Sequence, residues 1–403
     1  MDITQILSKR IQSVTESATL EMTRKSRELR DQGIDVITLS IGEPDFDTPD
    51  DVKQAAIQAI NNNDTHYPPV PGTLELRKAI ADKLLRDNHL NYKPTQIIVS
   101  AGAKQSIMNA FFCLLNDGDE VLIPAPFWVS YPEMVKMAGG IPKIIQSTVK
   151  QDFKISASQL ESAITSKTKA FIFSSPCNPS GSVYTKEELE SLAKVLAKNK
   201  HVFIFSDEIY EYINFNGKHE SIAQFPEIFD NVILINGLSK GFAMTGWRIG
   251  YMAAPQYIAD ACNTFQGQYT SGTCTISQAA ALKAVRTKPE DSVELTEMLS
   301  QFLERRNILF EGLTKIKGIE PNLPPGAFYL FPDISYYFGK TDGTITIKNS
   351  YDLCLYLLAN AHVALVSGDA FGCDNCIRFS YAASTQLIIE AVNRIEKALN
   401  LLY

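Results

Sequence analysis

The stretches KAFIFS at residues 169–174 and HVFIFS at residues 201–206 decide the fold. Each is a continuous apolar run that ends in a serine, and a helical pattern at residues 187–200 separates the two. Apolar strands that alternate with helices are typical of a mostly parallel sheet that is covered on both faces. Outward along the chain, the same pattern predicts a helix after Gly102 and strands at residues 96–100, 120–124 and 231–236.

The two ends of the chain have a different pattern. The first 48 residues hold a basic amphipathic helix and one short strand, at about residues 19–32 and 36–40. Beyond about residue 290 we expect a long charged helix, a C-terminal helix from Thr385, and shorter strands at residues 327–331 and 377–380. The sequence therefore predicts an α/β fold with two domains. A large domain with a mostly parallel central sheet flanked by helices would span residues 49–299, and a smaller α+β domain would be built from residues 1–48 and 300–403.

The overall composition is that of a globular protein. Of the 403 residues, 45% are hydrophobic and 21% are charged, which is close to the average for folded domains. The formal net charge of −7 argues against a nucleic-acid-binding surface. No apolar run approaches the ~18 residues that a membrane helix needs. Because residues Met1–Gln5 include an early acid and no apolar segment, we expect neither a membrane anchor nor a secretory signal.

The seven cysteines are few for this length, odd in number and mostly isolated. This distribution fits a reducing compartment better than a disulfide framework, and it predicts a cytoplasmic protein. Only Cys373 and Cys376 have the spacing C-x-x-C. Since no second Cys or His pair lies nearby to complete a zinc site, we expect these two to be ordinary thiols, and we expect no metal.

Chemically distinctive residues follow several predicted strands, which is where ligands bind in open parallel sheets. Gly102, Ala103 and Lys104 open a helix whose N-terminus attracts phosphate, although small residues are common at such turns. Asp207 comes directly after a strand, and Tyr210 lies one helical turn beyond it. The Asp207 carboxylate is either a turn or cap residue, or a buried carboxylate that faces a cationic ring nitrogen.

Three cations are candidates for the site, and two of them, Lys240 and Arg378, have two readings when only the sequence is considered. Lys240 lies just past the strand at residues 231–236, so it is either a surface lysine or a desolvated amine nucleophile. Arg248 lies in the Gly-rich segment that follows, where a guanidinium could bind a phosphate in a bidentate manner. Arg378 lies among apolar residues of a predicted strand, and a buried arginine needs a partner. That partner is either a carboxylate in a structural salt bridge or the carboxylate of a substrate.

In order along the chain, these segments resemble the class I/II pyridoxal-phosphate-dependent aminotransferases of fold type I. The bacterial aspartate aminotransferases are the branch that they resemble most. The resemblance spans nearly the whole chain, and matching motifs in sequence order make a chance match very improbable. The motifs that carry it are Ser17–Leu20, Ile41–Pro49, Tyr67–Gly72, Gly102–Gln105, Pro126–Pro132, Asn178–Gly181, Ser206–Tyr210, Ser239–Lys240, Met244–Arg248, Pro325–Tyr329 and Ile377–Tyr381.

The resemblance implies pyridoxal 5′-phosphate as the cofactor and assigns a role to each matching residue. Lys240 would bind the cofactor covalently and later carry the proton of the substrate. Asp207 would keep the pyridine nitrogen protonated, and Tyr210 and Asn178 would bind the phenolic oxygen. The remaining assignments are ring stacking by Trp128, phosphate binding by Ala103, Lys104, Ser239 and Arg248, and substrate carboxylate binding by Arg378, Asn178 and Gly42.

The resemblance also implies a homodimer and an acidic substrate. Tyr67 would reach the phosphate in the neighbouring subunit, so the active unit would be a dimer. Lys104 and Thr19 match residues that help to bind a side-chain carboxylate, which favours aspartate or glutamate as the donor in a ping-pong reaction with a 2-oxo acid. Two alternatives stay open: an aminotransferase that uses prephenate or a broader range of substrates, and a lyase of the same fold. One local departure is Gly272, at a position where many relatives carry Asn.

Overall fold

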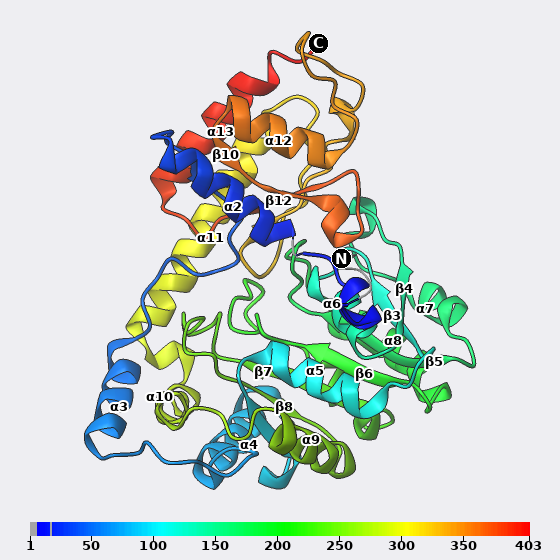
Figure 1. The fold of residues 1–403 in the computed structure, drawn as a ribbon, viewed down its shortest axis with the longest axis vertical. Helices are drawn as coiled ribbons and strands as arrows, with labels where there is room; N and C mark the ends of the chain where they lie inside the picture. The colour runs from blue at the N-terminus through cyan, green and yellow to red at the C-terminus, as the bar shows by residue number, and fades with distance from the viewer. Residues whose placement is uncertain (1–5, 17) are drawn as a thin grey trace.

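The computed structural model describes residues 6–16 and 18–403. Met1–Gln5, on which the prediction about a secretory signal rests, and Ser17, the first residue of a family motif, lie outside the described residues. In Figure 1 the central sheet and helices α3 to α10 occupy the lower part of the molecule, and helices α2, α12 and α13 gather in the upper part. Helix α11 (Val293–Thr314) runs between the two parts.

The lower part is built on a seven-stranded sheet with the order β2-β8-β7-β6-β5-β3-β4. Within it, β8 pairs antiparallel with both of its neighbours, and the other pairs are parallel. The predicted mostly parallel sheet is therefore confirmed. Its strands are β2 (Ile97–Ser100), β3 (Glu120–Pro124), β4 (Ile141–Ile145), β5 (Thr168–Ser174), β6 (Phe203–Asp207), β7 (Val232–Gly237) and β8 (Gly250–Ala253).

Two strands of this sheet are not evident from the sequence. β4 is an edge strand, and because most of its residues keep some exposure it lacks a continuous apolar run. β8 lies inside the Gly-rich segment, for which the sequence pattern indicates only phosphate binding. Both strands are recognised by their pairing with distant neighbours rather than by their composition.

Helices cover both faces of the sheet, as the apolar strands require. One buried cluster joins the sheet to α5, α6 and α9, and another joins its opposite face to α4, α8 and α10. Helix α8 illustrates the local cause: Thr185 and Glu188 form a capping box, and Leu189, Leu192 and Leu196 place apolar groups on one face. The helices of this part are α3 (Asp50–Asn61), α4 (Leu74–Asn88), α5 (Ala103–Leu114), α6 (Ser130–Met137), α7 (Ala157–Ala163), α8 (Lys186–Lys198), α9 (Gln256–Tyr269) and α10 (Thr275–Arg286).

The upper part brings the two ends of the chain together. β1 pairs parallel with β10 through Ile37 and Val363, and β11, β12 and β9 form an antiparallel sheet of three strands. The division into two domains stays a prediction, and its boundary at residues 299 and 300 falls inside α11. The remaining elements are α1 (Lys9–Gln12), α2 (Ala18–Asp31), β1 (Ile37–Thr38), β9 (Tyr329–Leu330), α12 (Ser350–Asn360), β10 (Val363–Ala364), β11 (Val366–Ser367), β12 (Ile377–Ser380) and α13 (Thr385–Leu399).

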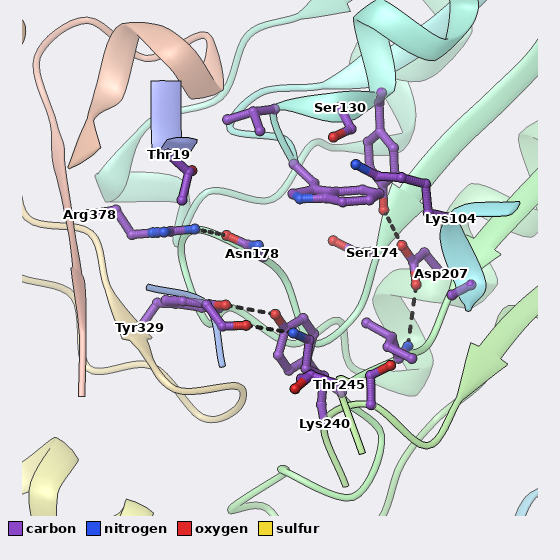
Figure 2. A pocket seen from close by; sticks show the side chains of 18 of the residues that line it. Thr19, Lys104, Ser130, Ser174, Asn178, Asp207, Lys240, Thr245, Tyr329 and Arg378 are labelled. Atoms are coloured by element: carbon purple, nitrogen blue, oxygen red, sulfur yellow. Dashed lines mark hydrogen bonds between the residues drawn. The ribbon is translucent and has the colours of Figure 1, made fainter. Parts of the chain in front are cut away.

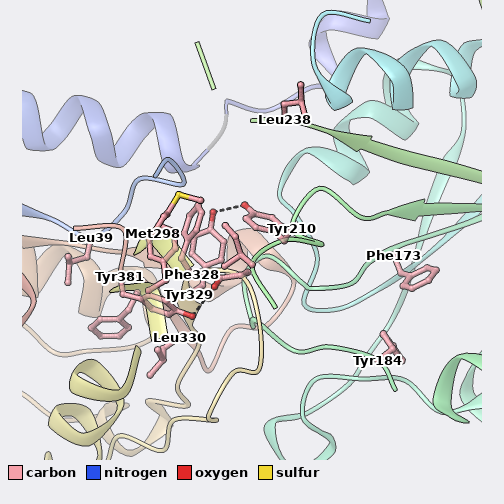
Figure 3. Close-up of a cluster of buried hydrophobic side chains, with 14 of the residues drawn as sticks. Leu39, Phe173, Tyr184, Tyr210, Leu238, Met298, Phe328, Tyr329, Leu330 and Tyr381 are labelled. Atoms are coloured by element: carbon pink, nitrogen blue, oxygen red, sulfur yellow. Dashed lines mark hydrogen bonds between the residues drawn. The ribbon is translucent and has the colours of Figure 1, made fainter. Parts of the chain in front are cut away.

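A buried aromatic cluster fills the junction between the upper part and the sheet (Figure 3). Phe328 and Tyr329 lie beside Tyr381, and the Tyr210 hydroxyl meets the Tyr329 hydroxyl at 2.7 Å. Tyr210 comes from the turn after β6, so this contact ties the end of the sheet to the upper part. Within the described part of the chain, none of the helices has the length and the apolar content that crossing a membrane requires.

Candidate active site

A pocket of about 380 Å³ lies beyond the carboxyl ends of β5, β6 and β7, where the upper part meets the sheet (Figure 2). It collects the predicted site residues from motifs far apart in the chain into one place, with a single exception. Tyr67 lies outside the pocket, and this residue is 94% exposed. The predicted residues that line the pocket are Thr19, Gly42, Ala103, Lys104, Trp128, Asn178, Asp207, Tyr210, Ser239, Lys240, Arg248 and Arg378.

Lys240 follows β7 on a tight turn and points its amine into the pocket. Its Nζ donates a hydrogen bond to the carbonyl oxygen of Gly42 at 2.5 Å. Burial lowers the pKa of Lys240 to about 8, although the negative charge of Glu43 opposes this shift. A substantial fraction of the amine is therefore neutral near physiological pH, as a nucleophile or a base requires.

Asp207 is the last residue of β6 and is almost fully buried. The Tyr131 hydroxyl donates to its Oδ2 at 2.6 Å, and the backbone N–H of Ile209 donates to its Oδ1 at 3.3 Å. Burial raises the pKa of Asp207 to about 6, while the hydrogen bond from Tyr131 opposes the shift. A turn follows β6, so Asp207 caps no helix, and its side chain faces the pocket.

Tyr210 and Tyr329 meet at the floor of the pocket. The hydrogen bond between their hydroxyl groups joins the turn after β6 to β9, and burial raises the pKa of Tyr210 well above its usual value. Gly42 lies against this pair so closely that a Cβ there would be 2.7 Å from the Tyr329 hydroxyl. Any larger residue at position 42 would therefore displace the tyrosines or close the pocket.

Arg378 projects from β12 toward the pocket and is only 2% exposed. Its guanidinium donates to Asn178 Oδ1 at 3.0 Å and to the carbonyl oxygen of Ser40 at 2.6 Å. Its Nε has no hydrogen-bond partner, and no carboxylate among residues 6–16 and 18–403 forms an ion pair with the guanidinium. The reading of Arg378 as half of a structural salt bridge is therefore wrong for the described structure.

The opposite end of the pocket suits an anion. No side chain caps the N-terminus of α5 at Gly102, so the first backbone N–H groups of Ala103 and Lys104 face outward. The Arg248 guanidinium lies directly against Gly102, where a Cβ would approach its terminal nitrogen to 2.5 Å. Arg248 is held by the carbonyl oxygen of Thr245 at 2.7 Å. Ser239 adds a hydroxyl to the same region.

Trp128 forms a flat wall between these two ends. The Lys104 ammonium lies 4.7 Å from the centre of the indole ring, and the Tyr131 ring meets the indole edge to face at 89°. Thr19, from α2, also lines the pocket, and Figure 2 shows its side chain on the side of Arg378, across from Lys104. The Lys104 ammonium therefore adds a further cation to the pocket wall, apart from the guanidinium of Arg378.

Sequence reasoning missed several residues that shape the pocket. Tyr131 and Tyr329 lie inside motifs that carry the family resemblance, yet neither received a role. The sequence contained a clue to their role, because each is a tyrosine in an apolar segment, and a buried tyrosine needs a hydrogen-bond partner for its hydroxyl group. The other polar side chains in this group that line the pocket are Ser130, Ser174 and Thr245.

A buried ionic network supports the turn after β6 from behind. Glu208 accepts hydrogen bonds from Ser206 and from Ser221, and His219 Nε2 lies 2.8 Å from its second oxygen. Glu211 pairs with Lys83 of α4, whose side chain is 2% exposed. Because the ammonium of Lys83 neutralises this acidic cluster, the network anchors the segment that carries Asp207 and Tyr210.

Known proteins match this chain along its length. The family model for aminotransferase class I and II matches residues 34–395. A relative in Petunia hybrida, a bifunctional aspartate aminotransferase and glutamate/aspartate-prephenate aminotransferase, is 47% identical over 98% of this chain and 82% of its own length.

Two solved structures match with similar coverage. The aspartate aminotransferase of Rhizobium meliloti has a TM-score of 0.95 and 40% identity, covering 98% of this chain and 99% of that one. The aspartate aminotransferase of Thermus thermophilus with maleate has a TM-score of 0.91 and 38% identity, covering 97% and 99%. On this match of sequence, fold and length, the chain belongs to the class I and II aminotransferase family.

Proposed function

We propose that this protein moves the amino group of an acidic amino acid, aspartate or glutamate, to a 2-oxo acid in a ping-pong reaction. The observation that carries the substrate class is the buried guanidinium of Arg378, which has an unpartnered Nε and faces the same pocket as Lys240. Because the described residues offer this guanidinium no carboxylate partner, the α-carboxylate of a bound amino acid can form the ion pair with it. The relatives named above act on aspartate, glutamate or prephenate, which supports the same class.

Enzymes of this family and fold depend on pyridoxal 5′-phosphate, and the residues of the pocket fit that group. The uncapped start of α5, with Ser239 and Arg248, suits a phosphate. Trp128 offers a flat face to an aromatic ring, and Asp207 offers a buried carboxylate to a cationic ring nitrogen. Lys240 is the amine that would bind the cofactor covalently, and Tyr210 and Asn178 would bind its phenolic oxygen.

When bound, the cofactor supplies an electron sink that acidifies the Cα–H bond of the amino acid. Arg378 binds the α-carboxylate, and Asn178, whose Oδ1 already accepts from Arg378, keeps its Nδ2 hydrogens for the ligand. Lys240 Nζ takes the proton from Cα, because burial keeps a share of the amine neutral. Gly42 and Tyr329 close the far side and restrict the access of water.

Lys104 and Thr19 are proposed to bind the side-chain carboxylate of the substrate. The two carboxylates of aspartate or glutamate would then lie between the guanidinium of Arg378 and the ammonium of Lys104. The solved structure of the Thermus thermophilus aspartate aminotransferase is with maleate, a dicarboxylate, which supports the proposal of two carboxylate subsites.

A half-reaction tests the proposal. The cofactor-loaded protein is mixed with L-aspartate in the absence of an oxo acid, and the released oxaloacetate is measured. We expect release to stop at one equivalent per site, and we expect added 2-oxoglutarate to restart it with formation of glutamate. No release from aspartate or glutamate would refute the acidic specificity.

The same measurement separates the alternatives. Continued release of product without an oxo acid would identify a lyase. Transfer to prephenate that is faster than transfer to 2-oxoglutarate would favour the prephenate reading. Arg378→Leu should raise KM for aspartate, whereas Lys397→Leu, at the far end of α13, should leave it unchanged.

We also propose that the enzyme works as a homodimer in the cytoplasm. Tyr67 carries a large aromatic group on the surface rather than in the pocket of its own chain, which supports a role in a neighbouring subunit. The cysteines of the described chain are all free thiols, which supports a reducing compartment.

A further inference from the structure

Cys373 and Cys376 occupy one tight turn directly before β12. The backbone N–H of Cys376 donates to the carbonyl oxygen of Cys373 at 3.2 Å, which closes the turn. The two Sγ atoms are hydrogen-bonded at 3.7 Å. Cys376 is fully buried, and Cys373 keeps 7% of its surface exposed. The two thiols are therefore neighbours in space, and Cys373 is the one that keeps some exposed surface.

The geometry of this turn is compatible with a disulfide. A turn closed by a hydrogen bond between its first and fourth residues keeps their Cα atoms less than about 7 Å apart. That separation lies within the range that a disulfide spans, and the sulfurs need to approach to about 2.05 Å. When the sulfurs approach each other from 3.7 Å, the turn itself or the residues on either side of it must move.

The turn belongs to a small apolar cluster that connects the two parts of the molecule. Cys373, Cys376 and Phe371 pack with Phe331 from the upper part and with Phe153 from the lower part. This cluster is separate from the two clusters that cover the faces of the sheet. A change in the conformation of the turn should therefore alter the packing where the upper part meets the lower part.

The same turn controls the surroundings of Arg378. The backbone of Gly368 bonds to both cysteines, donating to Cys376 and accepting from Cys373 at 2.9 Å each, so the turn closes the loop that holds Phe371. The Phe371 ring lies 5.0 Å from the Arg378 guanidinium. The backbone carbonyl of Phe371 also accepts from Phe127, next to Trp128 of the pocket wall, at 3.1 Å.

We propose that Cys373 and Cys376 are a redox modification site, which hydrogen peroxide converts into a reversible disulfide that weakens substrate carboxylate binding at Arg378. The kinetic half of this inference rests on the proposed function, and the formation of the disulfide does not. It also revises the sequence-based expectation that the two cysteines are ordinary thiols.

The chemistry balances with the peroxide as the only oxidant. The Cys373 sulfur attacks one peroxide oxygen and breaks the O–O bond, which gives a sulfenic acid and one molecule of water. The Cys376 sulfur then displaces the hydroxyl group from that sulfenic acid, which gives the S–S bond and a second water. A dithiol reductant supplies two electrons and two protons for the reverse step. The hydrogen bond between the two thiols lowers the pKa of Cys373, which favours Cys373 as the first nucleophile.

The test compares holoenzyme before and after hydrogen peroxide, followed by alkylation, digestion and peptide mass measurement. We expect the peptide that contains both cysteines to lose two hydrogen atoms and to regain them with dithiothreitol. We expect KM for L-aspartate to rise about tenfold in the oxidised enzyme, because a displacement near 1 Å is costly in a binding site. Cys373→Ser should keep the reduced KM after peroxide, and Cys274→Ser, at an exposed cysteine, should behave like the wild type.

Two results overturn the proposal. One is a mass that shows no disulfide at this turn, including the case in which oxidation is confined to Cys113 and Cys262, which interact between α5 and α9. The other is a disulfide that leaves KM unchanged. A wild type that shows no transamination in either redox state refutes the proposed function instead, and the peptide mass still reports on the disulfide.

Discussion

Asp207 and Lys240 are opposite charges whose pKa values move toward each other. Burial raises the pKa of Asp207 to about 6, and burial lowers the pKa of Lys240 to about 8. Each shift has the sign that desolvation of the charged form produces. The charged form of each group is less stable in this pocket than it is in water. Such perturbed pKa values are typical of sites that bind a charged ligand.

Asp207→Asn should stabilise the cofactor-free protein at neutral pH while it abolishes transamination. The folded-state pKa of Asp207 is raised from 3.8 to about 6, so the folded protein favours the protonated form. Its contribution to stability is present at low pH and is lost as pH rises through the interval between these values. At pH 7 the charged carboxylate lowers the free energy of unfolding by up to about 3 kcal/mol, and the neutral side chain of asparagine removes this penalty. Urea unfolding at about pH 4.5 and pH 7.5 measures the effect.

The comparison with the wild type is the control for this prediction. The advantage of Asp207→Asn in unfolding free energy should grow between the two pH values. An advantage that is the same at both, or larger at the lower one, would contradict the account.

The amine of Lys240 should react with acylating reagents with a midpoint near pH 8 in the cofactor-free protein. Competitive labelling followed by peptide mass measures the reactivity of each lysine as pH is changed. Glu43→Gln should move this midpoint downward, because the negative charge of Glu43 raises the pKa of Lys240. Lys194, whose side chain is 65% exposed on α8, provides the reference lysine. A common midpoint for the two lysines would argue against a desolvated amine.

At the scale of elements, the start of α5 decides where an anion binds. Gly102 has a φ of 85°, and a Cβ there would lie 2.5 Å from the Arg248 guanidinium. Only glycine adopts this conformation without strain and also admits the arginine. One residue therefore sets both the path of the chain into the helix and the position of the cation beside it.

Gly102→Ala should weaken the binding of pyridoxal 5′-phosphate about tenfold, because it displaces a charge-assisted contact. The binding of pyridoxal, which lacks the phosphate, should change less. Gly118→Ala is the matched control, since Gly118 also has a positive φ, of 92°, but a Cβ there would meet nothing within 4 Å. Calorimetric titration of both ligands measures the difference. An equal loss for the two variants would assign the effect to backbone strain alone.

At the scale of the whole molecule, the pocket depends on two parts of the chain that meet only after folding. Arg378 bonds to Asn178 across 200 positions, and Lys240 bonds to Gly42 across 198. The pairing of β1 with β10, which follows α12, holds the segment that leads to Gly42 against the upper part. The carboxylate end and the amine end of the pocket are therefore aligned by the packing of the upper part on the sheet.

A mixture of two inactive variants should recover activity if Tyr67 serves the neighbouring subunit. Lys240→Ala lacks the amine, and Tyr67→Ala lacks the proposed contact across the dimer. After subunit exchange in equal amounts, roughly a quarter of wild-type activity is expected, because half of the dimers are mixed and each of those has one complete site. Activity no higher than the average of the two separate variants would show that Tyr67 acts within its own chain or not at all.

Local pattern was sufficient to predict β3, β5, β6, β7 and β12 from the sequence. In β3, β5, β6 and β7 the residues form largely apolar runs because both faces of each strand are buried, and this property is visible in neighbouring positions. β12 is predicted from the apolar residues on either side of Arg378. The types and the order of the candidate site residues were visible for the same reason, since they follow these strands. Their chemical roles stay predictions that the experiments above address.

Tertiary structure alone decided the remaining features. β4 and β8 are strands because of their partners, and a turn rather than a helix cap follows β6 at Asp207. The bond from Tyr131 to Asp207, and the absence of a carboxylate partner for Arg378 in the described chain, depend on residues far apart in sequence. The hydrophobic pattern of the sequence predicts which residues are buried. It does not predict which residues they contact, because those contacts form only when distant segments pack together.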